Sequence, residues 1–134
     1  MPAEPVAVVQ RAFEAWGRGG IDAMLELADP GIEWIVRHDL PDAGIYQGHE
    51  GVRQLLGRFE EVLEDQWIEP QEFIEAADDR VIVPLHWGGR GKVSGVEVSE
   101  RQGETWVFTV RNGKVTRVKE FRHKLEALEA ARAN

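Results

Sequence analysis

The stretch TWVFTVRNGKVTRVKEF (residues 105–121) contains two runs of strand-forming residues on either side of a tight turn. Val, Thr, Trp and Phe dominate both runs, and these residues pack well on a pleated surface. Asn112-Gly113 lies between the runs, and both residues tolerate the positive φ angles of a two-residue hairpin turn. The stretch therefore predicts an antiparallel β-hairpin with strands over 105–110 and 115–121.

Three more extended segments precede this hairpin, over residues 68–77, 81–87 and 96–98. Residues that favour turns separate them, at 77–80 and again at 91–95. Strands that follow one another through short turns pair in antiparallel fashion. We therefore expect one antiparallel sheet in the second half of the chain.

The first half of the chain has the periodicity of helices. From Gly48 to about Asp65, apolar residues recur at helical spacing and predict a long amphipathic helix. Earlier, Gly19-Gly20 separates a helical stripe that starts at Val6 from a second one over 21–28. Two short helices in tandem are therefore expected before the long one.

The remaining segments complete the expected order of elements. Residues 32–36 predict a short strand, and residues 38–44 predict a loop because turn residues crowd around a proline. The tail over 124–132 predicts a short helix with Leu125 and Leu128 facing inward. Helices first and hairpin-linked strands after them indicate an α+β fold with an antiparallel sheet.

Length and charge limit the classes of function. The 134 residues fit one domain, residues 1–134, and 43% of them are hydrophobic, as in globular chains. Sixteen Lys and Arg against 24 Asp and Glu give a net charge of −8. This acidity argues against a nucleic-acid partner, because binding a phosphate backbone requires a basic face.

Several other classes find no support in the sequence. No apolar run is long enough to span a membrane, and the N-terminal residues lack the pattern of a signal peptide, so we expect a cytoplasmic protein without a membrane partner. The chain has no cysteine, and its four His residues lack metal-ligand spacing. No glycine-rich phosphate-binding motif opens a helix. We therefore expect neither a metal nor a cofactor.

Three strings resemble the nuclear transport factor 2-like superfamily, and within it the SnoaL-like branch, which includes polyketide cyclases and relates to ketosteroid isomerases. They are VQRAFEAW (residues 9–16), YQGHEGVR (46–53), and RNGKV (111–115) followed by Glu120-Phe121. The resemblance covers nearly the whole chain. It implies a cone in which a highly curved sheet wraps around the long helix and encloses a mostly apolar pocket, with the tandem helices near the mouth.

The resemblance also implies site residues. Ketosteroid isomerases place a general-base Asp nine residues ahead of the Gly that opens the long helix, and the matching position is Asp39. Polyketide cyclases of this type place an acid/base Asp on the last strand, and the matching residue is Glu120. The Tyr and the second Asp of the isomerase oxyanion hole match Phe13 or Trp16 and Trp106, so this chain departs from classical steroid isomerisation.

Asp39 has a chemical rationale as a base. At the mouth of an apolar cavity a carboxylate is desolvated, which raises its pKa and makes it a better base near neutral pH. His38 is an alternative base, since adjacent residues of an extended segment point in opposite directions. A third interpretation is a solvated loop in which Asp39 only supports a turn.

His86 and Glu120 are candidates for a second acid or base. His86 lies mid-strand, and the pattern of its strand leaves open which face looks into the pocket, so a hydrogen-bonded sheet histidine is the alternative. Glu120 either faces the pocket or forms an ion pair with Arg37 or Arg122. Tyr46 either donates a hydrogen bond to a substrate carbonyl or packs beside the long helix.

Aromatic and aliphatic side chains suit a flat apolar ligand, although core packing is the alternative for each of them. The expected ligand contacts are Trp16, Trp34, Phe59, Trp106, Phe108 and Val118.

The sequence thus predicts a protein that binds a small hydrophobic, carbonyl-bearing molecule. As an enzyme it would carry out cofactor-free acid/base chemistry of the isomerase, cyclase or dehydratase type. The alternative is a non-catalytic ligand-binding or dimerisation module of the same fold. We also expect a homodimer, because the convex face of the sheet carries apolar side chains that need cover.

Overall fold

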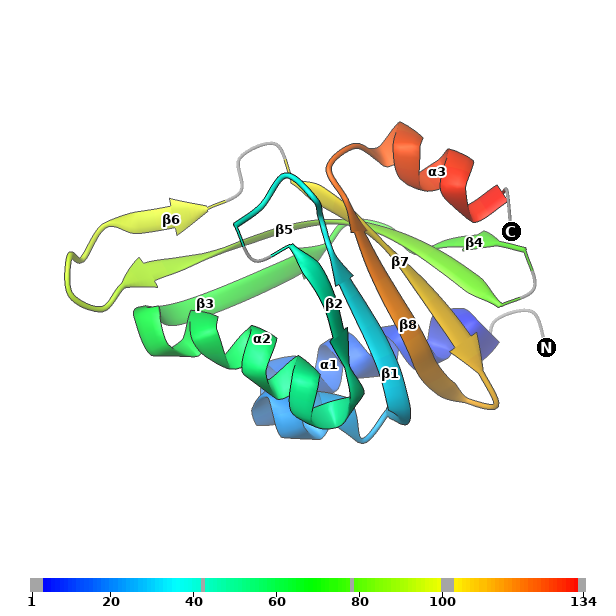
Figure 1. Ribbon diagram of the computed structural model, residues 1–134, viewed down its shortest axis with the longest axis horizontal. Coiled ribbons are helices and arrows are strands. Elements are labelled where there is room, and N and C mark those ends of the chain that lie inside the picture. The colour runs from blue at the N-terminus through cyan, green and yellow to red at the C-terminus, as the bar shows by residue number, and fades with distance from the viewer. Residues whose placement is uncertain (1–3, 42, 78, 100–102, 133–134) are drawn as a thin grey trace.

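A computed structural model describes residues 4–41, 43–77, 79–99 and 103–132. Its elements follow in the order α1 (Glu4–Leu25), β1 (Ala28–Val36), β2 (Gly44–Gln47), α2 (Gly48–Val62), β3 (Leu63–Pro70), β4 (Ile74–Ala76), β5 (Arg80–Gly91), β6 (Glu97–Ser99), β7 (Glu104–Arg111), β8 (Lys114–Phe121) and α3 (Lys124–Arg132). Figure 1 shows a curved sheet with α1 and α2 on one side and α3 on the other. The α+β class is confirmed.

The strands form one mixed sheet, with the order β2-β1-β8-β7-β5-β3 and with β4 and β6 paired to β5 off this path. β1 and β8 pair in parallel, so the expectation of an entirely antiparallel sheet is wrong at this pair. Short turns fix the direction only of strands that are neighbours in the sequence. β1 and β8 lie near opposite ends of the chain, and no short turn joins them. The sequence therefore has no local signal for whether they pair in parallel or antiparallel fashion.

β5 connects the two halves of the sheet. It is twelve residues long and pairs with β3, β4, β6 and β7. Its C-terminal part projects from the body of the molecule together with β6, and we call this projection the β5–β6 arm (Figure 1).

The hairpin turn at Asn112-Gly113 is confirmed, with φ angles of 54° and 74°. The register of β7 and β8 places Trp106 directly opposite Glu120. Side chains of directly opposed residues lie on the same face of a sheet. The register shifts by one residue between Thr109 and Val110, so the turn and this irregularity together bring an indole and a carboxyl group to the concave face.

The N-terminal helical region, α1, has two helical segments that meet at Gly20, at the Gly19-Gly20 boundary that the sequence predicts between two helices. α1 is one element with a kink at Gly20, whose φ of 78° and ψ of −163° glycine adopts readily. Ile21, Met24 and Leu25 still bury one face of the second segment. Among the described residues, no helix combines the length and the apolar character needed to cross a membrane.

Several strand and helix boundaries also differ from expectation. α2 ends at Val62 and not near Asp65, and β3 begins at Leu63, five residues before the predicted strand start at 68. β2 is a strand that the sequence does not mark, because its side chains are largely exposed and show no clear alternation.

Hydrophobic clusters flank the sheet on both sides. The larger one fills the space between the sheet, α1 and α2. The smaller one lies under α3, where Ala127 and Ala131 are buried and Leu128 packs against them as predicted. Leu125 is 68% exposed, so its predicted inward orientation is wrong; α3 turns its small alanine side chains toward the sheet instead.

Candidate functional site

A cavity of about 800 Å³ lies on the concave side of the sheet, lined from both α1 and α2 as well as from the strands. Its volume falls within the range of small-molecule sites, roughly 300–1,000 Å³. Most of its lining residues are aliphatic or aromatic, and the carboxyl groups of Glu104 on β7 and Glu120 on β8 are among the polar groups that line it.

One wall of the cavity consists of stacked aromatic rings. Phe13 and Trp16 of α1 both stack on Trp106 of β7, with ring centroids 6.5 and 6.4 Å apart and interplanar angles of 21° and 26°. Trp34 of β1 packs edge-on against Trp106 at 5.1 Å. Offset stacking of this kind holds the rings in fixed orientations and offers a flat apolar surface to a ligand.

A second aromatic group, from α2, β3 and β5, also lines the cavity. The Phe59 ring of α2 meets the Trp87 ring of β5 at 5.9 Å, and Trp67 of β3 also lines the cavity. Trp67 is 45% exposed, so it lies where the cavity meets solvent. A Cβ atom at Gly88 would lie 2.6 Å from the Trp67 ring, and the missing side chain therefore lets this indole approach β5.

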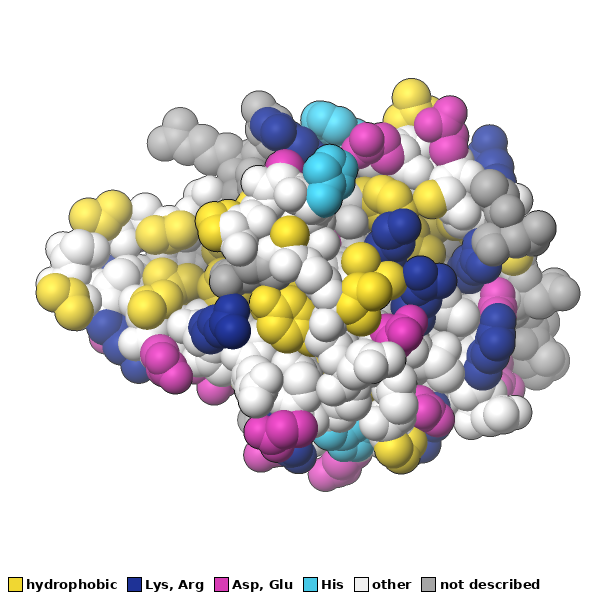
Figure 2. All heavy atoms as spheres, in the orientation of Figure 1, with side chains coloured by type: hydrophobic (Ala, Val, Ile, Leu, Met, Phe, Trp, Pro, Cys, Tyr) yellow, Lys and Arg dark blue, Asp and Glu magenta, His cyan; other side chains and the backbone are white. Residues whose placement is uncertain are grey.

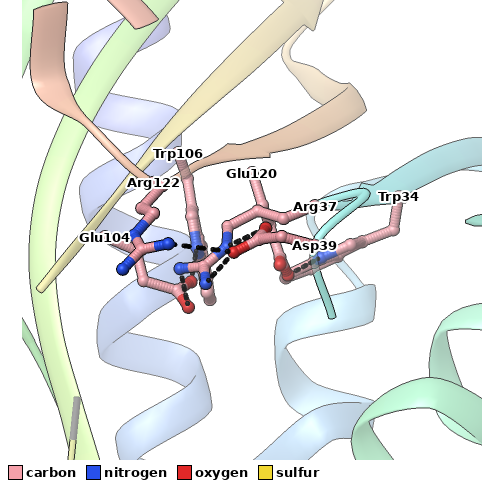
Figure 3. A network of polar contacts seen from close by, with 7 residues as sticks. All are labelled: Trp34, Arg37, Asp39, Glu104, Trp106, Glu120 and Arg122. Carbon is pink, nitrogen blue, oxygen red and sulfur yellow. Dashed lines mark hydrogen bonds and ion pairs between the residues drawn. The ribbon is translucent and has the colours of Figure 1, made fainter. Parts of the chain in front are cut away.

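A buried guanidinium, that of Arg37, connects the carboxylates of Asp39 and Glu104 (Figure 3). We call this region, together with Glu120, the polar end of the cavity. Arg37 donates to Glu104 Oε2 at 3.1 Å through Nη1 and to both Asp39 oxygens at 3.0 Å through Nε and Nη2. Trp106 Nε1 donates to Glu104 Oε1 at 2.6 Å, and Arg122 lies 3.7 Å from Asp39 Oδ2. The bidentate geometry makes the Arg37–Asp39 pair a strong one, and Arg37 divides its charge between two carboxylates.

Glu120 is the third carboxyl group of this region. Trp34 Nε1 donates to its Oε2 at 2.8 Å. Burial raises the pKa of Glu120 to about 7, and the negative charge of Glu104 acts in the same direction. Hydrogen bonds from Trp34 and from the Arg37 backbone, together with the Arg37 charge, lower this pKa without cancelling the rise. Glu120 therefore exchanges its proton near neutral pH.

The fold and the site geometry agree with the comparison with protein families. The model of the SnoaL-like domain matches residues 9–118, which run from within α1 to within β8 and end two residues before Glu120. The chain belongs to the SnoaL-like family. This confirms the resemblance that the sequence strings indicate.

Solved structures place the SnoaL-like chain within the NTF2-like fold. An NTF2-like protein from Burkholderia xenovorans LB400 is 32% identical, with 98% of this chain and 97% of that chain covered and a TM-score of 0.71. A putative SnoaL-like polyketide cyclase from Jannaschia sp. CCS1 is 22% identical, with coverage of 99% and 94% and a TM-score of 0.74.

A third solved structure is a hypothetical protein with a ketosteroid isomerase-like fold from Catenulispora acidiphila, in complex with trimethylamine. It is 15% identical, with coverage of 94% and 92% and a TM-score of 0.71. No curated protein matches the chain significantly.

Asp39 and His38 do not line the cavity of this SnoaL-like domain. The Asp39 side chain is about one-third exposed and is bound to Arg37. Hydrogen bonding to Arg37 holds the pKa of Asp39 below its ordinary value, which weakens it as a base. His38 is exposed.

His86 and Tyr46 also lie outside the cavity lining. The next residue of β5, Trp87, faces the cavity, and strand alternation places His86 on the opposite, convex face with Ile82, which packs under α3. The Tyr46 hydroxyl accepts a hydrogen bond from Arg58 at 3.4 Å, and the Arg58 guanidinium lies over the Tyr46 ring.

The six expected ligand contacts divide into two groups. Trp16, Phe59 and Trp106 line the cavity. Trp34, Phe108 and Val118 pack behind it and border only a void of about 10 Å³. Trp34 nevertheless reaches the polar end through its hydrogen bond to Glu120.

Sequence reasoning missed Glu104 and assigned Arg37 only as a partner for Glu120. A signal for Glu104 exists, because it lies two residues before Trp106 on β7 and therefore shares its face. Its contact with Arg37 spans 67 positions of the sequence and has no local signature.

Within the described part of the chain, no group of three potential metal-ligating side chains gathers in one place. The absence of a cofactor remains a prediction.

Proposed function

We propose that this SnoaL-like domain binds a small hydrophobic, carbonyl-bearing molecule in its cavity and moves a proton on it with Glu120, in a reaction of the isomerase, cyclase or dehydratase type. One observation supports this most strongly: Glu120 lines an aromatic cavity of about 800 Å³ and has a pKa of about 7. A general acid or base works best when its pKa lies near the operating pH.

The proton transfer uses both forms of one carboxyl group. Ionised Glu120 removes a proton from the carbon next to the substrate carbonyl, and the bond electrons move into the resulting enolate. Protonated Glu120 then returns the proton to the same carbon or to another one. Trp34 holds the carboxyl group in place through its indole N–H, and the stacked rings of Phe13, Trp16 and Trp106 orient a flat substrate.

The charge arrangement supports Glu120 over Asp39 as the proton carrier. Asp39 and Glu104 both take hydrogen bonds from Arg37, so their charges are compensated. In this proposal Asp39 offsets part of the Arg37 charge, which would otherwise lower the pKa of Glu120 further. His38, His86 and Tyr46 take no part.

Glu120→Gln should slow the exchange of α-protons in an enolisable aryl ketone by roughly 100-fold or more, because general acid–base catalysis contributes on the order of 10²–10⁴. The measurement is loss of the α-proton NMR signal in D2O with a panel of such ketones. Glu75→Gln, which removes an exposed carboxylate from β4, is the matched control and should exchange like the unmodified protein. Asp39→Asn should retain exchange within a few-fold.

Other outcomes of this assay favour other functions. If Asp39→Asn abolishes exchange and Glu120→Gln does not, Asp39 is the base. If the domain binds the ketones without accelerating exchange in any form, it is a non-catalytic ligand-binding module. The trimethylamine complex of a protein with a ketosteroid isomerase-like fold supports small-molecule binding as one use of this fold.

We further propose that two copies of this chain associate through the β5–β6 arm. Hydrophobic side chains gather over this arm in Figure 2, and Val93, Val96 and Val98 are exposed. Among the described strands β6 pairs only with β5, so its outer edge can pair with the same edge of a second copy around a two-fold axis.

The double change Val96→Lys and Val98→Lys should convert the dimer to a monomer, because two pairs of like charges would meet across the axis. Size-exclusion chromatography with light scattering measures the mass of both forms. A monomeric unmodified protein at high concentration, or a variant that stays dimeric, would contradict this interface.

A further inference from the structure

The geometry points to a second class of ligand for the same cavity: we propose that it binds hydrophobic ammonium ions, with the aromatic or aliphatic body against the stacked rings and the cation at Glu120. The inference uses the cavity of the proposed function and does not depend on proton transfer to a carbonyl compound.

The charges that line the cavity favour a cation. Among the described lining residues, four are acidic and one, Lys92, is basic; the acidic ones are Glu60, Asp65, Glu104 and Glu120. Asp65 pairs with Arg90 at 3.0 Å, and Lys92 is exposed. An anionic ligand would therefore add a negative charge to a lining that already has an excess of carboxylates, at a cost that rises with desolvation.

Among the residues that the structure describes, the polar end contains three carboxyl groups and two guanidinium groups. The charged groups that face Glu120 come from three places: Glu104 of β7, Arg37 and Asp39 after β1, and Arg122 after β8. Two guanidinium groups face the two carboxylates of Asp39 and Glu104, which leaves the charge of Glu120 without an equal cation. A bound ammonium group would complete the balance.

The aromatic wall offers a second interaction to the same ion. Trp106 contacts Glu104 through its indole N–H, while its ring stacks with Trp16 and Phe13 in the cavity wall. The aromatic wall thus begins one hydrogen bond away from Glu104, which lies at the edge of the Trp106 ring. Ammonium ions are attracted to the face of Trp and Phe rings, most strongly in desolvated sites. A cation at this end can contact a carboxylate and a ring face together.

Proton linkage gives the two ligand classes opposite pH dependence. A cation binds ionised Glu120, so below the Glu120 pKa of about 7 each binding event must release a proton. Its affinity should rise up to about tenfold per pH unit below that pKa and level off above it. An uncharged ketone accepts a hydrogen bond from protonated Glu120, so its affinity should fall above the pKa.

Three naphthyl probes of similar size test the inference: 2-naphthylmethylamine, 2-acetonaphthone and 2-naphthoate. Isothermal titration calorimetry on the full chain between pH 5.5 and 8 measures their affinities. We expect the amine to bind at least tenfold more tightly at pH 8 than at pH 5.5, and more tightly than naphthoate throughout. Glu120→Gln should weaken amine binding at pH 8 at least tenfold and remove its pH dependence, whereas Glu75→Gln should leave both unchanged.

The outcomes separate this inference from the proposed function. Ketone binding without amine binding overturns the inference and leaves the proposed function standing. Amine binding without ketone binding or ketone exchange supports the inference and contradicts the proposed function. Equal affinities for amine and naphthoate, or amine binding that Glu120→Gln does not alter, overturn the inference. Thermal melting of each variant checks that the fold is intact, and Glu120→Ala serves as the second variant if Glu120→Gln does not fold.

Discussion

Glu120→Gln should increase the free energy of unfolding at pH 8 by about 3 kcal/mol relative to the unmodified protein. Folding raises the pKa of Glu120 from 4.5 to about 7, and each pKa unit corresponds to about 1.4 kcal/mol. A carboxyl group whose pKa rises on folding contributes its stability below the unfolded-state pKa and loses it as the pH rises through the folded-state value. The unmodified protein should therefore lose stability between pH 4.5 and pH 7, and the glutamine variant should not.

The measurement is urea unfolding of both proteins across pH 4.5–8. Only the difference between the two curves is used, because other carboxylates titrate in both proteins alike. The amide introduced by Glu120→Gln keeps an oxygen that can accept the Trp34 hydrogen bond, so the variant resembles the protonated form. Parallel curves for the two proteins would mean that Glu120 is ionised throughout this range. A similar difference between the unmodified protein and Glu75→Gln would mean that the change in stability does not come from the burial of Glu120.

Arg37→Met should destabilise the fold by about 3–5 kcal/mol. The Arg37 side chain is 7% exposed and pairs with Glu104, whose side chain is 4% exposed. Removing one partner of a buried ion pair leaves the other as an uncompensated buried charge, which is more costly than the loss of the pair itself. The same change should raise the pKa of Glu120 further, since the Arg37 charge acts to lower it.

Double-mutant analysis distinguishes this cause from simple loss of packing. Arg37→Met combined with Glu104→Gln should regain a substantial part of the lost stability, because the amide removes the uncompensated charge and still accepts the Trp106 hydrogen bond. Urea unfolding at pH 7 of the unmodified protein, the two single variants and the double variant gives the four free energies of the cycle. If the double variant is as unstable as the sum of the single changes, the pair is not coupled and the burial argument fails.

Local rules predict the parts of this fold that have local causes. The turn between β7 and β8 follows from the φ preferences of Asn112 and Gly113, whereas the pairing of Trp106 with Glu120 also needs a one-residue register shift between Thr109 and Val110. α3 is likewise visible in its composition. The parallel pairing of β1 with β8 has no such cause, because it depends on how the whole sheet curves back on itself.

The same distinction applies to the site. Glu120 could be found from its place on the last strand, but its pKa depends on burial and on Glu104. Asp39 has the right position for a base by counting from Gly48, yet Arg37, two residues away, binds both of its oxygens. Whether a carboxylate forms an ion pair depends on the three-dimensional geometry of the side chains around it, and residue spacing in the sequence does not predict that geometry.

The distribution of tryptophan gives this protein an intrinsic optical probe. Of its five tryptophans, Trp16, Trp67, Trp87 and Trp106 line the cavity, and Trp34 donates its indole hydrogen to Glu120. Indole emission depends on the polarity and charge around the ring, so both ligand entry and the protonation of Glu120 change the fluorescence without any label. Even without a ligand, emission should titrate with a midpoint near pH 7 as Glu120 ionises beside Trp34, and this titration should be absent from Glu120→Gln.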